Sequence, residues 1–371
     1  MSIEPFRLER YFAEHEFTVP FQLSCSDCET MTIAELLSLE DGARGKFENI
    51  PLGYTDSQGS MELRTEIAAL YDTIAPDQVI VHTGAEEAIF VFMNAVCDSG
   101  DHIIVHRPCY QSLYEVARSA GCEVTFWEAC EGNGWRLDVD FLAEKIRTDT
   151  KAVVFNSPHN PTGYHMDAAA LHEIGRLSKE RGFFVFSDEV YRFLEYCDEE
   201  RLPAFCDIDD RAVSLGVLSK SFGLAGLRIG WIATRNRNVL DAVSAYKDYT
   251  TICNSAPSEF LAALALRNRD KILERTRNIV LDNLKRLEVF IGDHSDVFFW
   301  VPPKAGPVAF PRLRTGESTE TFCRRLREKK GVLLLPGNVF GDEYSDHVRI
   351  GFGRRNLDEC LGRLGDFLAG K

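Results

Sequence analysis

A lysine flanked by two hydroxyl groups is the first feature of this sequence that could do covalent chemistry. Lys220 follows the apolar run 213–218, lies between Ser219 and Ser221, and is followed eight residues later by Arg228, beyond a glycine-rich turn. A lysine amine can form a Schiff base with an aldehyde, and serine and arginine side chains can hold an anion such as a phosphate. The alternative for a lysine taken alone is an ordinary surface residue. The spacing therefore suits a ligand that carries both an aldehyde and a phosphate.

Three further segments place polar residues at the carboxyl ends of short hydrophobic strands. They are 155–163 (FNSPHNPTG), 182–191 (GFFVFSDEVY) and 79–89 (VIVHTGAEEAI). Proline and glycine in the first segment stop a strand or helix from continuing, so a fixed loop is expected there. Open α/β sheets bind ligands at the carboxyl edge of their strands. The segments together predict one ligand site assembled from separate strands.

With these motifs in this order, the chain resembles the class I/II aminotransferases, enzymes of aspartate-aminotransferase fold type I that use pyridoxal 5'-phosphate (PLP). The resemblance covers nearly the whole length and rests on the His-Asn-Pro-Thr-Gly loop at 159–163, the Asp-x-x-Tyr at 188–191 and the Ser-Lys pair with its arginine. It implies an α/β fold with a large PLP-binding domain, 46–270, built on a mostly parallel seven-stranded sheet flanked by helices. A smaller α+β domain would comprise 1–45 and 271–371.

The hydrophobic pattern agrees with this organisation, because short strand-like runs alternate with helical segments. The expected strands of the large sheet are 79–82, 102–105, 124–127, 153–155, 183–186, 213–218 and 229–233. One long helix is predicted over 258–290. The expected elements of the small domain are strands 308–310, 332–334 and 347–351 and helices 319–329 and 357–368.

The resemblance implies a catalytic or cofactor role for each residue that matches a family motif. Lys220 would carry PLP as a Schiff base and then act as the base that moves the substrate Cα proton. Asp188 would pair with the pyridine nitrogen and keep it protonated. Tyr191 and Asn160 would hydrogen-bond the 3-oxygen of the ring, and Tyr110 would stack on it.

The phosphate would be held by several donors. The backbone amides of Ala85 and Glu86 lie at an expected helix N-terminus, and Ser219 and Arg228 would add a hydroxyl and a guanidinium. A carboxylate beside a phosphate is unfavourable, so the side chain of Glu86 is expected to point away. Tyr54 would reach the phosphate of a neighbouring subunit, which implies an obligate homodimer with shared active sites.

The substrate would be held by Arg349, which matches the family arginine that clamps the α-carboxylate, and by Asn160. No motif identifies a second arginine for a dicarboxylate substrate. The usual glycine-rich substrate loop is replaced here by 23–29 (LSCSDCE). Within it, Asp27 and Glu29 could face a cationic side chain or solvent, and solvent is the expectation.

Fold and cofactor leave the reaction type open, because several PLP reactions share this scaffold. The predicted activity is transfer of an amino group between an amino acid and a 2-oxo acid by a ping-pong route. Stretches at 247–251, 306–311 and 335–341 are similar to capreomycidine synthase and its relatives, which eliminate and cyclise a hydroxyarginine. A PLP-dependent lyase or cyclase acting on an arginine-like amino acid is therefore the alternative. A catalytically idle PLP-binding protein is the alternative from another class.

Composition narrows the partners. A formal net charge of −15 argues against nucleic acid or an anionic membrane. No apolar run approaches the roughly 20 residues that span a bilayer, and the N-terminus has no apolar signal core. The eleven scattered cysteines suit reduced thiols in the cytoplasm. Cys25 and Cys28 form a CxxC without a second ligand pair, so no metal site is expected.

Overall fold

A computed structural model describes residues 3–370 of the chain, and its central element is a seven-stranded sheet. The strands lie in the order β2-β8-β7-β6-β5-β3-β4. Their bounds are β2 Val79–His82, β3 His102–Arg107, β4 Glu123–Glu128, β5 Thr150–Asn156, β6 Phe184–Asp188, β7 Ala212–Val217 and β8 Gly230–Ala233. Strand β8 runs antiparallel to both β2 and β7, and the other neighbouring strands are parallel. The predicted mostly parallel seven-stranded sheet is confirmed.

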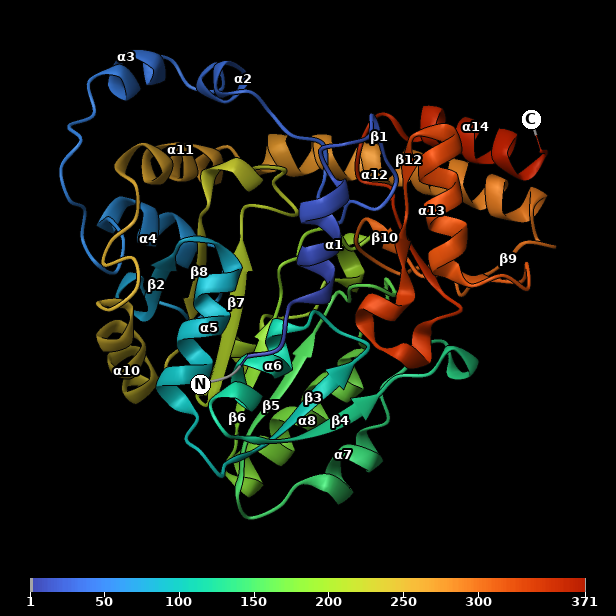
Figure 1. Cartoon of the computed structure of the whole chain (residues 1–371). Coiled ribbons are helices and arrows are strands. Elements are labelled where there is room, and N and C mark those ends of the chain that lie inside the picture. Colours follow the sequence, from blue (N-terminus) through green and yellow to red (C-terminus); the bar gives the residue numbers. More distant parts are fainter. Residues whose placement is uncertain (1–2, 371) are drawn as a thin grey trace.

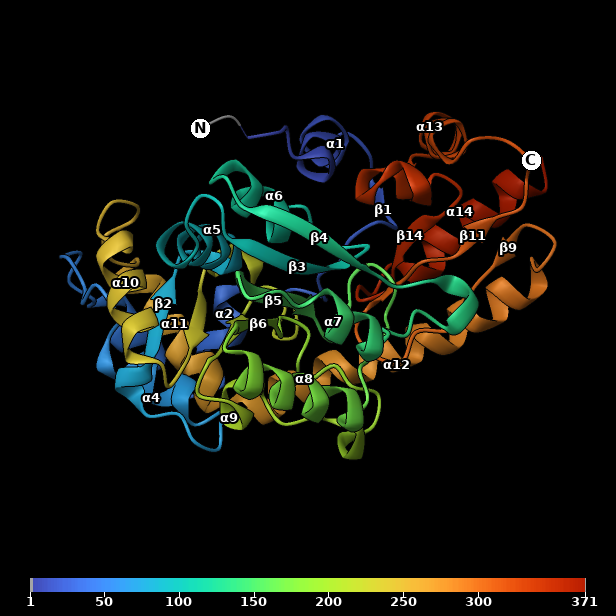
Figure 2. The same cartoon turned by 90° about the horizontal axis from the view of Figure 1, so that it is seen from below.

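Helices cover both faces of this sheet, which explains why its central strands are almost continuously apolar. Every residue of β7 is buried, as expected for a strand that solvent reaches on neither face. Figure 2 shows α5 (Gly84–Val96) and α6 (Ser112–Ser119) on one side of the sheet, with α8 (Ala168–Arg181) and α9 (Phe205–Ile208) on the other. Each parallel strand can therefore present its polar last residues only at its carboxyl end.

The C-terminal part of the chain forms a second group of elements. A three-stranded antiparallel sheet has the order β10-β14-β13. The elements here are β9 Phe298–Phe299, β10 Val308–Ala309, β11 Arg312–Leu313, α13 Thr319–Lys330, β12 Val332–Leu333, β13 Leu335–Pro336, β14 Val348–Gly351 and α14 Leu357–Leu368. The N-terminal strand β1 (Phe21–Gln22) pairs in parallel with β12. The expected association of the N-terminal segment with C-terminal elements is thus present, and the domain boundaries themselves stay predictions.

Helix α1 (Arg7–His15) lies between the large sheet and the C-terminal elements (Figure 1). The Tyr11 hydroxyl donates to the carbonyl of Leu334 at 2.8 Å on the C-terminal side. On the opposite side, the Tyr110 hydroxyl donates to Glu9 at 2.8 Å. The helix therefore bridges the two groups of elements. The remaining helices are α2 Ile33–Leu37, α3 Ala43–Glu48, α4 Met61–Ala68, α7 Val139–Lys145 and α10 Arg237–Lys247.

The single long helix predicted over 258–290 is wrong. The structure has two helices, α11 (Ala256–Arg267) and α12 (Arg269–Asp293), which meet at Asn268. Asn268 leaves the helical region, with φ −105° and ψ 22°, and its side-chain amide donates to the carbonyl of Leu264 at 3.0 Å. An asparagine side chain competes in this way with the helical hydrogen bonds of the backbone. The apolar periodicity continues across the break and hides it.

Within residues 3–370, no helix is both long enough and apolar enough to cross a membrane. The same residues contain no group of three or more His, Cys, Asp or Glu side chains arranged to hold a metal ion. Cys25 and Cys28 are buried and free. Burial raises the pKa of the Cys25 thiol to about 11, which leaves it protonated and unreactive near neutral pH.

Candidate active site

A cavity of about 360 Å³ lies at the carboxyl edge of the large sheet and is closed on one side by α1. It gathers residues from segments that are far apart in the sequence. The predicted site residues that line it are Ala85, Glu86, Tyr110, Asn160, Asp188, Tyr191, Ser219, Lys220, Arg228 and Arg349. Tyr54 does not line it, and its side chain is 93% exposed. Ten predicted residues are therefore brought together within one chain, and one is not.

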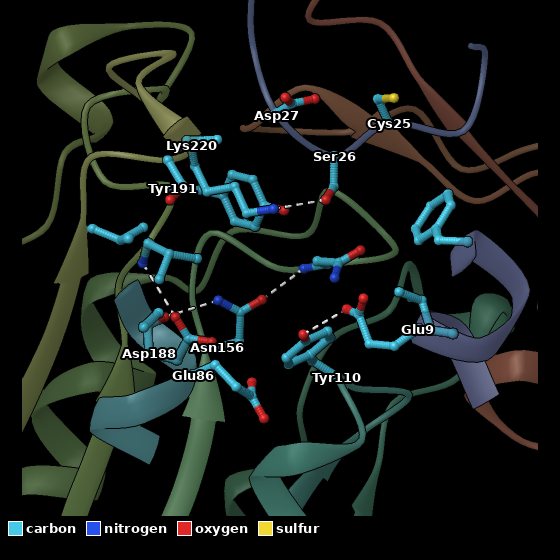
Figure 3. Close-up of a pocket in the computed structure, with 18 of the residues that line it drawn as sticks. Glu9, Cys25, Ser26, Asp27, Glu86, Tyr110, Asn156, Asp188, Tyr191 and Lys220 are labelled. Atoms are coloured by element: carbon cyan, nitrogen blue, oxygen red, sulfur yellow. Dashed lines mark hydrogen bonds between the residues drawn. The ribbon is translucent and has the colours of Figure 1, made fainter. Parts of the chain in front are cut away.

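Lys220 and Tyr191 lie side by side in this cavity (Figure 3). The amine of Lys220 donates to the hydroxyl of Ser26 at 2.8 Å and lies 5.9 Å from the centre of the Tyr191 ring. Tyr191 is only 1% exposed, and its hydroxyl bonds to no polar atom of residues 3–370. A buried hydroxyl without a partner is costly, so this position fits a ligand that completes the bond.

Asp188 ends strand β6 with a buried carboxylate. One carboxylate oxygen accepts from the backbone N–H of Val190 at 3.2 Å. Burial raises the pKa of Asp188 to about 7, although the Val190 N–H and the nearby Lys220 charge lower it. The side chain of Asn156, at the end of β5, holds this region by donating to the Asp188 carbonyl at 2.9 Å and accepting from the Asn160 N–H at 2.7 Å. A buried carboxylate of this kind fits the protonated nitrogen of a pyridine ring.

The first turn of α5 faces the guanidinium of Arg228. Gly84 begins the helix with φ +82°, and a Cβ at this position would overlap the guanidinium. A Cβ at Gly230 would lie 2.8 Å from the backbone nitrogen of Ala85. Two glycines thus allow backbone and guanidinium to approach closely at a helix N-terminus, where unpaired N–H groups and the helix dipole favour an anion. The arrangement fits the phosphate of PLP.

Glu86 is the unusual residue of this turn. Its carboxylate accepts from the hydroxyl of Ser112 at 3.0 Å, and in Figure 3 it is directed away from Lys220. It still lines the cavity, and burial raises its pKa to about 7. The side chain therefore turns toward α6 and becomes neutral more easily than an exposed glutamate does.

Arg349 supplies the carboxylate-binding group that the sequence predicts. Its side chain is 1% exposed; Nη1 donates to Asn160 Oδ1 at 3.0 Å, while Nε and Nη2 donate to the carbonyl of Ser24 at 3.2 and 2.7 Å. A guanidinium has five N–H groups. These bonds leave one N–H on each terminal nitrogen, which is the pair that a carboxylate accepts bidentately.

The solvent expectation for Asp27 is wrong. Its carboxylate is 16% exposed and accepts from Nε and Nη2 of Arg354 at 3.2 and 2.8 Å. Glu29 accepts from the backbone N–H of Arg355 at 2.9 Å. Sequence reasoning had no means of pairing residues 27 and 354, because only the fold brings them together.

Several residues of the cavity had no assigned role in the sequence. They are Leu8, Glu9, Phe12, Glu16, Cys25, Ser26, Ile89, Asn156 and Val217, among others. Asn156 had a usable signal, because it ends a predicted strand inside the quoted loop motif. The residues of α1 and of segment 23–29 carried none, because their side of the cavity is set by packing against β14.

Comparison with known proteins agrees with this donor set. The family model "Aminotransferase class I and II" matches residues 39–364. An aspartate aminotransferase from Thermotoga maritima is 33% identical and covers 85% of this chain and 83% of its own length. Capreomycidine synthase from Streptomyces vinaceus is 31% identical, with coverages of 97% and 93%.

Solved structures extend the likeness to the whole fold. A PLP-dependent aminotransferase from Streptococcus suis superimposes with a TM-score of 0.94 at 32% identity, covering 100% of this chain and 99% of its own. A PLP-dependent cyclase, OrfR, superimposes with a TM-score of 0.91 at 29% identity, with coverages of 100% and 98%. The chain therefore belongs to the class I and II aminotransferases and is a PLP-dependent enzyme that transfers an amino group between an amino acid and a 2-oxo acid.

Proposed function

We propose that this aminotransferase binds PLP covalently through Lys220 and runs its two half-reactions in the cavity described above. The observation that carries the proposal is that one cavity gathers Lys220, Asp188, Arg228 and Arg349. They are an amine, a buried carboxylate, a guanidinium at a helix N-terminus and a buried guanidinium with two free N–H groups. Bound PLP would supply an electron sink for the negative charge that develops at the substrate Cα.

The protein residues do the binding and the proton transfer. Arg228 and the first amides of α5 hold the phosphate, and the carboxylate of Asp188 keeps a proton on the ring nitrogen. The Tyr191 hydroxyl and the side-chain N–H groups of Asn160, whose carbonyl oxygen is used by Arg349, face the 3-oxygen. Lys220, freed as an amine when substrate binds, takes the Cα proton and returns it to a different carbon of the bound pair.

The test of this proposal is a spectral titration of the purified holoenzyme with single amino acids. A donor amino acid is expected to replace the visible band of the lysine-bound cofactor with the stable pyridoxamine band. One equivalent of the matching 2-oxo acid should be released, and addition of a second 2-oxo acid should reverse the change. A holoenzyme that releases no 2-oxo acid with any amino acid would contradict the assignment.

A second candidate function is elimination or cyclisation of a cationic amino acid, and the charge of the cavity favours it. The side of the cavity formed by α1 and segment 23–29 carries the carboxylates of Glu9, Glu16 and Asp27. Burial raises the pKa of Glu16, and Asp27 and Glu9 raise it further, whereas Arg354 lowers it. A cationic substrate side chain would relieve this repulsion. In the titration this reaction would release ammonia or a cyclised product while the lysine-bound band persists.

The assembly, location and pathway are also proposals. We propose a homodimer in which Tyr54 completes the phosphate site of the partner subunit. Tyr54 is exposed together with the apolar side chains of Leu52, Met61 and Tyr249, and a second copy would remove such side chains from water. A cytoplasmic location and a role in amino-acid metabolism or biosynthesis rest on the scattered cysteines and on the reaction class.

A further inference from the structure

The amine of Lys220 has a fixed neighbour that none of the assigned roles uses. It donates to the hydroxyl of Ser26 at 2.8 Å, across 194 residues of sequence (Figure 3). Ser26 belongs to segment 23–29, which replaces the glycine-rich substrate loop of the family. The contact therefore joins the most reactive group of the cavity to the part of this chain that departs most from the family pattern.

The backbone on both sides of Ser26 is held by the C-terminal elements. The N–H of Leu23 donates to Leu333 O at 2.9 Å, and the Leu23 carbonyl accepts from the Gly351 N–H at 2.8 Å. A Cβ at Gly351 would overlap the carbonyl of Cys25, and one at Gly353 would lie 2.5 Å from the carbonyl of Asp27. These close backbone contacts fix the position of the residue between them.

The next carboxylate along the chain is turned away from the amine. Asp27 makes its paired contact with Arg354 at 3.2 and 2.8 Å, so it is already neutralised. The partner that remains at hydrogen-bond distance from Lys220 is a neutral hydroxyl. A carboxylate in this place would favour the protonated ammonium, whereas a hydroxyl orients the amine without adding charge.

A neutral amine has two N–H groups and one lone pair, and the lone pair must point at the proton it removes. A bond from one N–H to Ser26 restricts rotation of the amine and leaves the lone pair free. In the transfer, an N–H bond forms as the substrate Cα–H bond breaks, and the electron pair of the Cα–H bond passes to the cofactor ring. Orientation of this kind lowers the barrier because fewer geometries of the amine are unproductive.

We propose that Ser26 is a positioning residue that holds the freed amine of Lys220 for proton transfer at the substrate Cα. This inference rests on the proposed covalent role of Lys220. Ser26 acts through the lysine and is distinct from the residues that bind the phosphate, the ring or the substrate carboxylate.

The first test measures turnover of the holoenzyme in four variants. Ser26→Ala is expected to lower kcat about 10-fold with little change in KM, and to increase the kinetic isotope effect of a Cα-deuterated donor, because proton transfer becomes slower. Ser26→Thr keeps the hydroxyl and should recover most of kcat. Ser26→Asp should move the rising limb of the pH–rate profile to higher pH. Thr30→Ala, which removes an exposed hydroxyl outside the cavity, is the matched control and should behave as wild type.

The second test uses the cofactor-free protein, so that it does not depend on the reaction. Acylation of Lys220 by acetic anhydride is followed by mass spectrometry as a function of pH. Ser26→Ala should change the labelling rate relative to Thr30→Ala, and Ser26→Asp should require a higher pH for half-maximal labelling. The proposal is overturned if Ser26→Ala matches Thr30→Ala in both tests. Labelling that depends on Ser26 in an enzyme without any half-reaction would instead contradict the proposed function and leave the contact standing.

Discussion

Lys220 is the residue on which the covalent chemistry depends, and the structure places its amine beside Tyr191 with Asp188 and Arg228 in the same cavity. Lys220→Ala is expected to abolish the visible band of the lysine-bound cofactor and to lower kcat by at least about 100-fold, because both the Schiff base and the general base are lost. PLP should still bind, since the phosphate donors and Asp188 are unchanged. Absorbance spectra and retained PLP after gel filtration check this. An unchanged visible band would contradict the assignment of Lys220.

Glu86 makes cofactor affinity depend on pH. Burial raises the pKa of its carboxyl to about 7, so the group is neutral below that pH and anionic above it. An anion repels the phosphate, and two unit charges in water interact by about 1 kcal/mol at 4 Å. Glu86→Gln is therefore expected to tighten PLP binding about 5-fold relative to wild type at pH 8, with little difference at pH 6.

The measurement for Glu86 is the dissociation constant of PLP for both proteins at both pH values. Because the comparison is a ratio at each pH, titration of Asp188 and of PLP itself cancels. Equal ratios at pH 6 and pH 8 would show that the carboxylate does not act on the phosphate.

At the scale of the element, the N-terminus of α5 depends on a residue without a side chain. Gly84→Ala forces a Cβ onto φ +82° and into the guanidinium of Arg228. The expected cost is about 1–3 kcal/mol of stability from the backbone conformation, and the displaced guanidinium should weaken PLP binding about 10-fold. Urea unfolding of the cofactor-free protein and PLP titration measure the two effects separately.

Gly182→Ala is the matched control for that variant. Gly182 ends α8 at φ +85°, and a Cβ there would meet nothing within 4 Å. It should lose comparable stability through the same backbone strain and keep wild-type affinity for PLP. Equal affinities in the two variants would mean that Arg228 does not need its position against α5.

At the scale of the whole molecule, the proposed shared sites predict complementation between inactive subunits. Lys220→Ala and Tyr54→Ala impair different residues of one site if that site spans two subunits. Refolding an equal mixture should restore about a quarter of wild-type activity, because half of the dimers are mixed and each has one intact site. Activity that stays at the sum of the separate variants would contradict a shared site, and sedimentation of wild type gives the oligomeric state independently.

Much of the large sheet could be predicted because its strands are local apolar runs with polar residues at one end. The strands around Asp188 and Lys220 were expected within a few residues of their observed bounds. The break at Asn268 was missed, because one asparagine does not interrupt the apolar periodicity and its side chain decides the local backbone only in place. The pairing of Asp27 with Arg354 was missed because it depends on the position of β14 relative to segment 23–29.

The sequence by itself determined the fold class, the family, the cofactor and the ten cavity residues contributed by recognisable motifs, because each motif is a short run whose residue types follow from its own chemistry. Only the tertiary structure decided what faces those residues. The hydroxyl of Ser26 at the Lys220 amine, the free N–H pair of Arg349 and the carboxylates of α1 all depend on packing of the N-terminal segment against the C-terminal strands. Such contacts join residues hundreds of positions apart, and no local pattern encodes them.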